Sequence, residues 1–183
     1  MSHYALTDLA KSLPAVVPFV GPETQERALG RPFCARLGAN ESQFGPSPLA
    51  IEAMTQAAQE VWQYGDPENY DLRQALAAHH NIDPGHITIG EGIDGLLLTL
   101  TRLTVAPGDA ILTSQGAYPT FNYHAAGNGG TLHMVPYLDD HEDPQSLAEQ
   151  AHHLGAKLVY FANPDNPMGS WHSADPVQDL IDN

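Results

Sequence analysis

Apolar positions change their spacing along the chain in a way that predicts alternating helices and strands. Short apolar runs occupy residues 86–89, 110–113, 131–135 and 157–162. Between these runs, apolar residues recur three or four positions apart, which is the spacing of one helix face. Continuous apolar strands separated by helices of about ten residues indicate a parallel sheet that is covered on both faces. We therefore predict an α/β fold, a three-layer αβα architecture with a mostly parallel sheet.

The predicted helices begin and end at recognisable residues. Ser47 and Asp143 each precede a proline at the first helical position, and a capping residue followed by proline favours a helix start. Gly155 follows the last apolar positions of the later helix, where glycine favours a helix end. Helices are expected over residues 48–62, 71–80, 96–105, 119–127, 144–154 and from 174 onward.

The first 38 residues differ from the rest of the chain, because they contain four prolines and little periodicity. We expect residues 1–38 to form an N-terminal arm and residues 39–183 to form the α/β domain. A parallel sheet that stops at residue 162 leaves an unpaired edge, which folded proteins avoid. The last predicted helix also reaches Asn183 without a stop signal, so we expect a truncated domain.

Charge and cysteine content narrow the class of protein. The net charge is −15 at pH 7, from seven Lys and Arg against 22 Asp and Glu. Such a balance repels nucleic-acid phosphates and anionic lipid, so neither partner is expected. Cys34 is the one cysteine, which excludes an internal disulfide. Because Pro14 and Pro18 interrupt the N-terminal apolar stretch, no signal peptide or membrane span is predicted. These features are typical of a cytoplasmic protein.

Histidine pairs and an acidic segment are candidates for a metal site. His79 is followed by His80, and His152 by His153, but adjacent residues on a helix point about 100° apart. Neither pair can therefore bind one ion from one helix face, and no metal site is predicted. Residues 139–143 are acidic and are predicted to form a solvated turn.

A glycine-rich turn occupies residues 90–95, between a predicted strand and a predicted helix. Its glycines let the backbone approach an anion, and the first free N–H groups of the helix point towards it. The Gly-x-Gly-x-x-Gly pattern also matches the dinucleotide fingerprint, which requires an acid at the end of the second strand. That strand is followed here by Ser114 and Gln115, so a phosphate site and a plain tight turn stay open.

An Asn-Pro loop, residues 163–169, directly follows the predicted strand over 157–162. Proline restricts the residue before it to extended backbone, so Asn163 and Asn166 are both held rigidly. Open α/β sheets bind ligands at the carboxyl ends of their strands. The loop is therefore a candidate ligand site, and a proline-stiffened turn without a ligand is the alternative.

This loop resembles the Asn-Pro-x-Asn-Pro-x-Gly signature of class I/II aminotransferases, which belong to the fold-type I pyridoxal-phosphate superfamily. Other segments resemble one branch, the histidinol-phosphate aminotransferase-like enzymes, in order and spacing: residues 37–48, 64–73, 90–95 and 118–121. The resemblance covers residues 36–170. It implies the fold of PLP-dependent transferases of fold type I, with this chain as the N-terminal half of the large domain. It also implies pyridoxal 5'-phosphate (PLP) as the cofactor.

The resemblance further implies a set of cofactor contacts. The backbone amides of Ile93 and Asp94 would bind the cofactor phosphate, although Ile93 stands where the family has a serine. Phe121 would stack on the pyridine ring, and the side-chain amide of Asn166 would donate to the phenolic oxygen. Tyr64 would reach the phosphate of the neighbouring subunit, which implies a homodimer.

The substrate end of the site would be closed by Ala39 and Asn40, again from the resemblance. The implied substrates are small molecules, an amino acid and a 2-oxo acid. His124 follows Phe121 by three residues. A packing or surface role is favoured for it, with a place beside the ligand as the alternative.

Transamination needs a lysine that binds the cofactor covalently and moves the proton. The chain contains only Lys11 and Lys157. Lys11 lies in the predicted arm, and Lys157 opens a strand at the end opposite to the ligand edge. No catalytic residue is therefore assigned within the chain. The catalytic lysine is expected beyond Asn183, and this chain alone is expected to be inactive.

The sequence thus favours a PLP-dependent aminotransferase that transfers an amino group between an amino acid and a 2-oxo acid. Two alternatives lie close to it: a PLP-dependent decarboxylase of the same superfamily, and a noncatalytic truncated paralogue. A nicotinamide-binding domain is disfavoured by the missing acid at the strand end and by the Asn-Pro loop.

Overall fold

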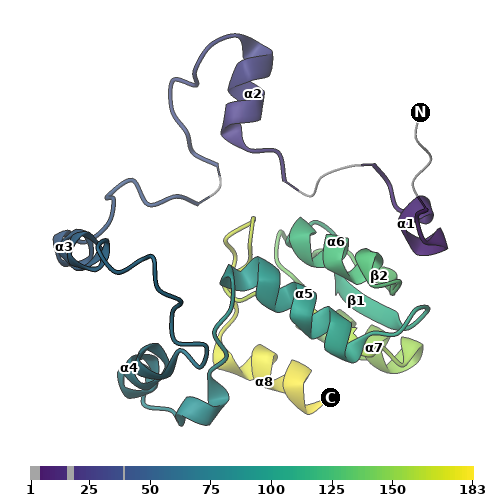
Figure 1. Cartoon of the computed structure of the whole chain (residues 1–183). Helices are drawn as coiled ribbons and strands as arrows, with labels where there is room; N and C mark the ends of the chain where they lie inside the picture. The colour runs from purple at the N-terminus through teal and green to yellow at the C-terminus, as the bar shows by residue number, and fades with distance from the viewer. Residues whose placement is uncertain (1–4, 16–18, 39) are drawn as a thin grey trace. The chain divides into compact units, whose positions relative to one another are not determined.

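The computed structural model describes residues 5–15, 19–38 and 40–183. The chain divides into two compact units (Figure 1). One is Val20–Gly90, and the other is Glu91–Asn183 together with the described residues up to Phe19. Each unit is described by itself below.

The larger unit is built on a three-stranded sheet whose strands are all parallel, in the order β2-β1-β3. The strands are β1 (Ala110–Ser114), β2 (Thr131–Val135) and β3 (Leu158–Val159). In the central strand, Ile111 is paired with Leu132 on one side and Leu158 on the other. Every residue of β1 after Ala110 is buried, as expected for a strand that is covered on both faces.

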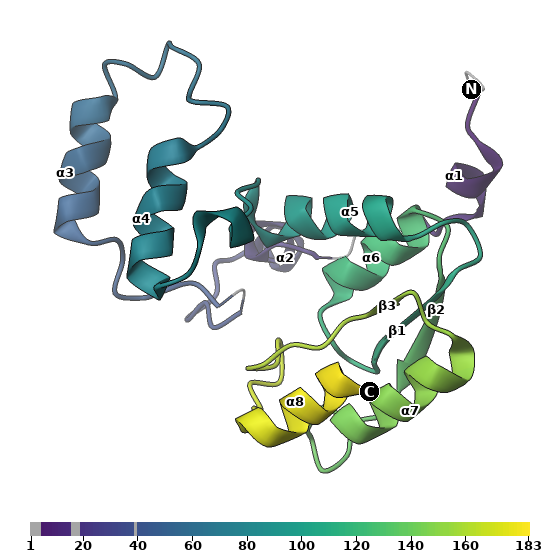
Figure 2. The ribbon, with the colours of Figure 1, turned by 90° about the horizontal axis from the view of Figure 1, so that it is seen from below.

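Helices cover both faces of this sheet. Figure 2 shows α5 (Gly92–Thr104) and α6 (Pro119–Gly127) on one side of the strands, and α7 (Pro144–Leu154) and α8 (Ala174–Asp182) on the other. The buried apolar side chains form one cluster on each face: one joins α5, α6 and β1, and the other joins α7, β1 and β2. The predicted three-layer αβα architecture with a parallel sheet is confirmed.

The strand β1 supplies both clusters, because successive side chains of a strand point to opposite faces. Ile111 packs on the α5 and α6 side, and Leu112 packs against Leu147 of α7 on the other side. All three side chains are essentially inaccessible to solvent. Burial of each such side chain stabilises the fold by roughly 1.5–3 kcal/mol.

Local sequence rules account for the ends of α7. The side chain of Asp143 accepts a hydrogen bond from the backbone N–H of Ser146 at 3.2 Å, and Pro144 occupies the first turn. At the other end Gly155 has φ +61°, a left-handed conformation that glycine adopts without steric cost. The predicted bounds of this helix are therefore confirmed.

Gly130 marks a close approach between the end of α6 and the start of β2. A Cβ atom added there would lie 3.0 Å from Cγ1 of Val105 and 3.2 Å from the carbonyl oxygen of Ala125, and closer still to the side chain of Ile111. Gly130→Ala is therefore expected to lower the free energy of unfolding by roughly 1–3 kcal/mol, the usual effect of overpacking a core. Urea denaturation followed by circular dichroism measures this loss.

Gly127→Ala is the matched control for that substitution. A Cβ atom at Gly127 meets nothing within 4 Å, and the residue ends α6. Alanine there is expected to leave stability unchanged or to raise it by up to about 1 kcal/mol. Equal urea midpoints for the two variants would contradict the close packing described for Gly130.

Two predicted strands differ from the structure. Residues 84–86 form a short 3₁₀ helix, η1 (Pro84–His86), and the run over 86–89 does not form a strand, although Ile87 has extended backbone. Extended backbone becomes a strand only beside a partner, and no described strand pairs with this run. The strand predicted over 157–162 is also shorter, because after β3 the chain turns into the Asn-Pro loop.

The smaller unit is helical and largely exposed. It contains α2 (Pro22–Leu29), α3 (Pro48–Ala57), α4 (Tyr70–His80) and η1. The helix predicted over 48–62 thus ends earlier, at Ala57. The guanidinium group of Arg73 joins α4 to η1 by donating to the carbonyl oxygen of Pro84 at 2.8 Å.

The segment predicted as an arm contains two short helices, α1 (Asp8–Ser12) and α2. Local signals explain α2, since Pro22 lies in its first turn and Gly30, with φ +71°, ends it. The domain boundary at residue 38 stays a prediction. In the part of the chain that the structure describes, no helix combines the length and apolar character needed to cross a membrane.

Candidate functional site

The carboxyl edge of the sheet is the candidate site of the larger unit. Here β1 ends at Ser114, and the chain leaves β3 for the Asn-Pro loop. The helix α6 begins shortly after β1 ends, so its start lies near this edge. Two contacts show that α5 runs in the same direction as α6: Asp94 contacts His124 of α6, and Thr101 accepts a hydrogen bond from Asn128, just after α6. The start of α5 therefore lies on the same side.

The first turn of α5 offers backbone donors. Gly92 begins the helix with φ +73°, a conformation that favours glycine. The N–H groups of Ile93 and Asp94 lie in the first turn, where a helix has no internal acceptor for them. Glu91 at the N-cap makes no side-chain hydrogen bond to the helix. These amides therefore suit a phosphate group, which the helix dipole also stabilises.

The side chains of this turn point to different surroundings. Ile93 is exposed, so its side chain is not needed for packing. The carboxylate of Asp94 lies within hydrogen-bond distance of Nε2 of His124, whose ring is buried. This contact joins the start of α5 to α6.

Phe121 lies in the hydrophobic core. It is 1% exposed, and its ring is stacked on that of Tyr160, with ring centroids 4.5 Å apart and planes at 20°. Because Phe121 is buried, its predicted stacking on the cofactor ring stays a prediction. The sequence did not single out Tyr160, although it is a phenol within an otherwise apolar run. Burial raises the pKa of Tyr160.

The Asn-Pro loop has a closed backbone. Both Asn-Pro peptide bonds are cis. The N–H of Gly169 donates to the carbonyl oxygen of Asp165 at 2.9 Å, and the N–H of Asp165 donates to that of Ser170 at 2.8 Å. The segment from Asp165 to Ser170 is therefore a compact turn held at both ends.

The two asparagines of this loop differ in their contacts. The side-chain amide of Asn163 donates to the carbonyl oxygen of His172 at 3.0 Å, and its oxygen accepts from the His172 N–H at 2.9 Å. Within the described residues, no hydrogen bond engages the partly exposed side chain of Asn166. Asn163 is thus committed to the fold, whereas Asn166 can bind a ligand.

Glu142 lies beneath the Asn-Pro loop and is 1% exposed. One carboxylate oxygen accepts from the hydroxyl of Ser114 at 2.6 Å, and the other accepts from the N–H of Ala162 at 2.9 Å. Burial raises the pKa of Glu142, although these two hydrogen bonds oppose the shift. The prediction that residues 139–143 form a solvated turn is wrong at Glu142, because Ser114 at the end of β1 and Ala162 after β3 both donate hydrogen bonds to its buried carboxylate.

Tyr137 and Asp165 form a second polar contact under the loop. The hydroxyl of Tyr137 donates to Asp165 at 2.8 Å, and Asp165 is buried. Burial and then the neighbouring carboxylate raise the pKa of Tyr137. The sequence did not predict this contact, because its two residues are 28 positions apart and share no local pattern.

Neither lysine lies at the carboxyl edge of the sheet. The backbone N–H of Lys157 donates to the carbonyl oxygen of Ala110, the first residue of β1, at 2.8 Å. Lys157 is therefore at the amino edge, as the sequence predicts. Lys11 lies in α1, where its ammonium group pairs with Asp8 at 2.9 Å.

The three remaining predicted residues are Ala39, Asn40 and Tyr64. Ala39 lies outside the described residues. Asn40 and Tyr64 are exposed residues of the smaller unit, which is described by itself. Their roles stay predictions. Among the described ranges 5–15, 19–38 and 40–183, no group of His, Cys, Asp and Glu is arranged to hold a metal ion.

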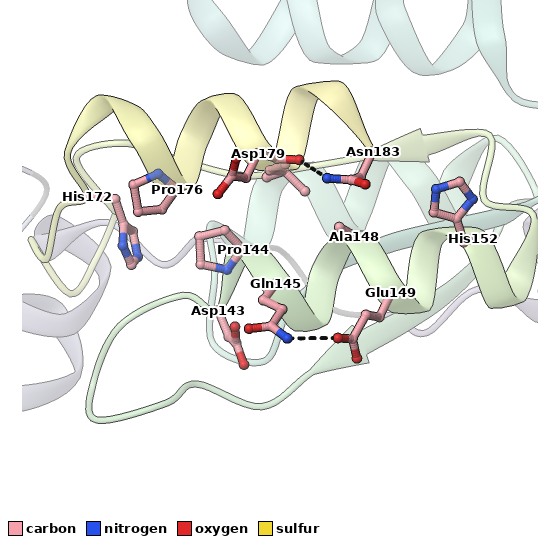
Figure 3. Close-up of a pocket in the computed structure, with 11 residues that line it drawn as sticks. Asp143, Pro144, Gln145, Ala148, Glu149, His152, His172, Pro176, Asp179 and Asn183 are labelled. Atoms are coloured by element: carbon pink, nitrogen blue, oxygen red, sulfur yellow. Dashed lines mark hydrogen bonds between the residues drawn. The ribbon is translucent and has the colours of Figure 1, made fainter.

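A cavity of about 730 Å³ lies between α7 and α8, on the face of the sheet that these two helices cover (Figure 3). None of the residues predicted to bind the cofactor lines it. Its acidic side chains include Asp143, Glu149 and Asp179, which disfavour a phosphate group. The carboxyl edge, rather than this cavity, has the donors that an anionic ligand requires.

The fold and the carboxyl edge together define a class: three-layer α/β proteins with unpaired backbone amides at a helix start and an asparagine loop after a parallel strand. Residues 34–183 match the family model "Aminotransferase class I and II". The chain belongs to this family.

Its relatives include histidinol-phosphate aminotransferases from several bacteria. That of Anaeromyxobacter is 35% identical over 172 residues, which are 93% of this chain and 47% of the relative. That of Staphylococcus haemolyticus is 31% identical over 147 residues, 80% of this chain and 42% of the relative. The chain therefore spans about half the length of the curated relatives it matches.

A solved structure is also similar over nearly the whole chain. It is the crystal structure of histidinol-phosphate aminotransferase from Sinorhizobium meliloti in complex with pyridoxal-5'-phosphate. The TM-score is 0.93 and the sequence identity 53%, covering 99% of this chain and 48% of that one. The similarity supports the predicted fold of PLP-dependent transferases of fold type I.

Proposed function

We propose that this chain forms part of a PLP-dependent aminotransferase of the histidinol-phosphate aminotransferase-like kind. The intact enzyme would transfer an amino group between an amino acid and a 2-oxo acid. The observation that carries this proposal is the set of free donors at the carboxyl edge: the first amides of α5 and the side chain of Asn166. The PLP complex of the Sinorhizobium meliloti relative supports the choice of cofactor.

The residues present at this edge fit PLP. The amides of Ile93 and Asp94 would bind its phosphate, and Asn166 would donate to its phenolic oxygen, which favours the ionised form of that oxygen. Phe121 would stack on its pyridine ring. When bound, the cofactor supplies the electron sink for the reaction, and these residues bind and orient it.

The resemblance implies three further residue roles. Ala39 and Asn40 would close the substrate end, and Tyr64 would reach the phosphate in the neighbouring subunit of a homodimer. The lysine that carries the chemistry is expected beyond Asn183, because Lys157 lies at the amino edge of the sheet. A cytoplasmic location also stays part of this proposal.

Binding of PLP to the purified 183-residue chain tests the proposal. We expect saturable binding in an absorbance titration, competed by inorganic phosphate. After borohydride reduction and dialysis, no cofactor should stay attached in stoichiometric amounts, because neither lysine of the chain is at the site. The Lys157→Arg variant is the control and should bind PLP like the wild type.

Two results would contradict this proposal. Absence of saturable binding would count against the cofactor site itself. Stoichiometric labelling of Lys157 or Lys11 after reduction would show that a lysine of this chain reaches the cofactor. The first result would also favour the noncatalytic paralogue, whereas the decarboxylase alternative differs only in the reaction of the intact enzyme.

A further inference from the structure

Asn166 extends from a turn whose backbone is held by the residue before it, Asp165. Within the described residues the Asn166 side chain has no hydrogen bond of its own, so the backbone of the turn sets the position from which its amide extends. Asp165 provides the strongest local constraint. Its N–H and its carbonyl oxygen close the turn through Ser170 and Gly169, and its side chain is buried under the loop.

The buried carboxylate of Asp165 depends on one contact. One of its oxygens accepts from the hydroxyl of Tyr137 at 2.8 Å, and the other is buried without a hydrogen-bond partner in the described structure. A buried carboxylate that lost this contact would have no hydrogen bond at all, which is strongly unfavourable. It would then have to turn towards water and carry the adjoining peptide of Asn166 with it.

Tyr137 is well placed to hold this carboxylate, because it follows β2 by two residues and is itself partly buried. The other end of the loop has a separate support. There Glu142 accepts from the N–H of Ala162, and its carbonyl oxygen contacts Nε2 of His172 at 2.8 Å.

We propose that Tyr137 is a positioning residue for the cofactor: its hydrogen bond to Asp165 holds the turn that directs the side-chain amide of Asn166 towards the phenolic oxygen of PLP. This inference rests on the proposed function for the role of Asn166. The arrangement of the turn itself is independent of the cofactor.

Tyr137→Phe in the full chain removes the hydroxyl and keeps the ring. NMR of the ¹⁵N-labelled, cofactor-free protein should show changed side-chain amide shifts for Asn166. The Gly169 amide, which donates to Asp165, should exchange about tenfold faster. The dissociation constant for PLP should rise by about tenfold. Tyr123→Phe is the matched control, because Tyr123 is exposed on α6, and it should change none of these values.

Asp165→Asn is the conservative companion, because asparagine keeps an acceptor for the Tyr137 hydroxyl. It should retain the Gly169 protection, and it tests the proposal even where Tyr137→Phe does not fold. Loss of the Gly169 protection in Asp165→Asn would overturn the proposal. So would unchanged signals in Tyr137→Phe, or changed signals with an unchanged dissociation constant.

The failure of the proposed function gives a different result. A wild-type chain that binds no PLP would contradict that function. The role of Tyr137 in holding the turn would then still be decided by the Asn166 shifts and the Gly169 exchange of the cofactor-free protein.

Discussion

Replacement of Glu142 by alanine is expected to lower the free energy of unfolding by roughly 2–5 kcal/mol. The substitution leaves the buried hydroxyl of Ser114 and the N–H of Ala162 without an acceptor. Each unsatisfied buried group costs about 1–3 kcal/mol, and the lost side chain also leaves a cavity. Urea denaturation at neutral pH, followed by circular dichroism, measures the loss.

Glu142→Gln is the matched control. Glutamine has nearly the same shape, its oxygen can accept from Ala162, and its amide can donate to the oxygen of Ser114. Its free energy of unfolding is expected to stay within about 1 kcal/mol of the wild-type value. If the alanine and glutamine variants unfolded at the same urea concentration, the two hydrogen bonds would contribute no stability.

A comparison of the wild type with Glu142→Gln tests the ionisation of Glu142. Burial raises the pKa of Glu142 in the folded state above its ordinary value of 4.5, so the folded protein holds this proton more tightly than the unfolded chain. The resulting stabilisation is fully present below pH 4.5 and is lost as the pH rises through the raised pKa. Wild type should therefore lose stability relative to Glu142→Gln as the pH rises from 4.5. A constant difference across this range would contradict the raised pKa.

Asn166→Ala is expected to raise the dissociation constant for PLP by about tenfold or more. The substitution removes a donor to an ionised oxygen, and hydrogen bonds to charged groups contribute about 1.5–3 kcal/mol. Stability should change little, because the Asn166 side chain is partly exposed and has no hydrogen bond within the described residues. An absorbance titration and a urea denaturation of the same protein measure the two quantities.

Asn163→Ala should show the reverse pattern. It removes two hydrogen bonds with the backbone of His172, so the free energy of unfolding should fall by roughly 1–2 kcal/mol. The dissociation constant for PLP should change less than in Asn166→Ala. Equal effects of the two substitutions on affinity would refute the division of roles between the two asparagines.

Much of the fold could be predicted because its signals are local. Proline at a helix start and glycine at a helix end act within one turn, which is why the predicted and observed bounds agree for α6 and α7. The run over 86–89 shows the limit of such signals. Its residues favour extended backbone, but a strand also requires a hydrogen-bonded neighbour, and the described part of the chain provides none.

The candidate site also combines features with local signals and features that depend on distant residues. The resemblance of short motifs indicated the first turn of α5 and the Asn-Pro loop, since both lie within a few consecutive residues. The burial of Glu142 and Asp165 could not be predicted in this way. Their partners, Ser114 and Tyr137, are each 28 positions away in the sequence.

The sequence by itself thus determined the order of helices and strands after residue 90, the family and the segments proposed to carry ligand donors. It did so because capping, periodicity and motif chemistry act over a few neighbouring residues. Only the tertiary structure decided which donors are free. It engages Asn163 with His172 and leaves Asn166 available, and it buries Phe121 against Tyr160. These outcomes depend on which distant segments meet at the carboxyl edge of the sheet, where burial makes every unpaired polar group costly.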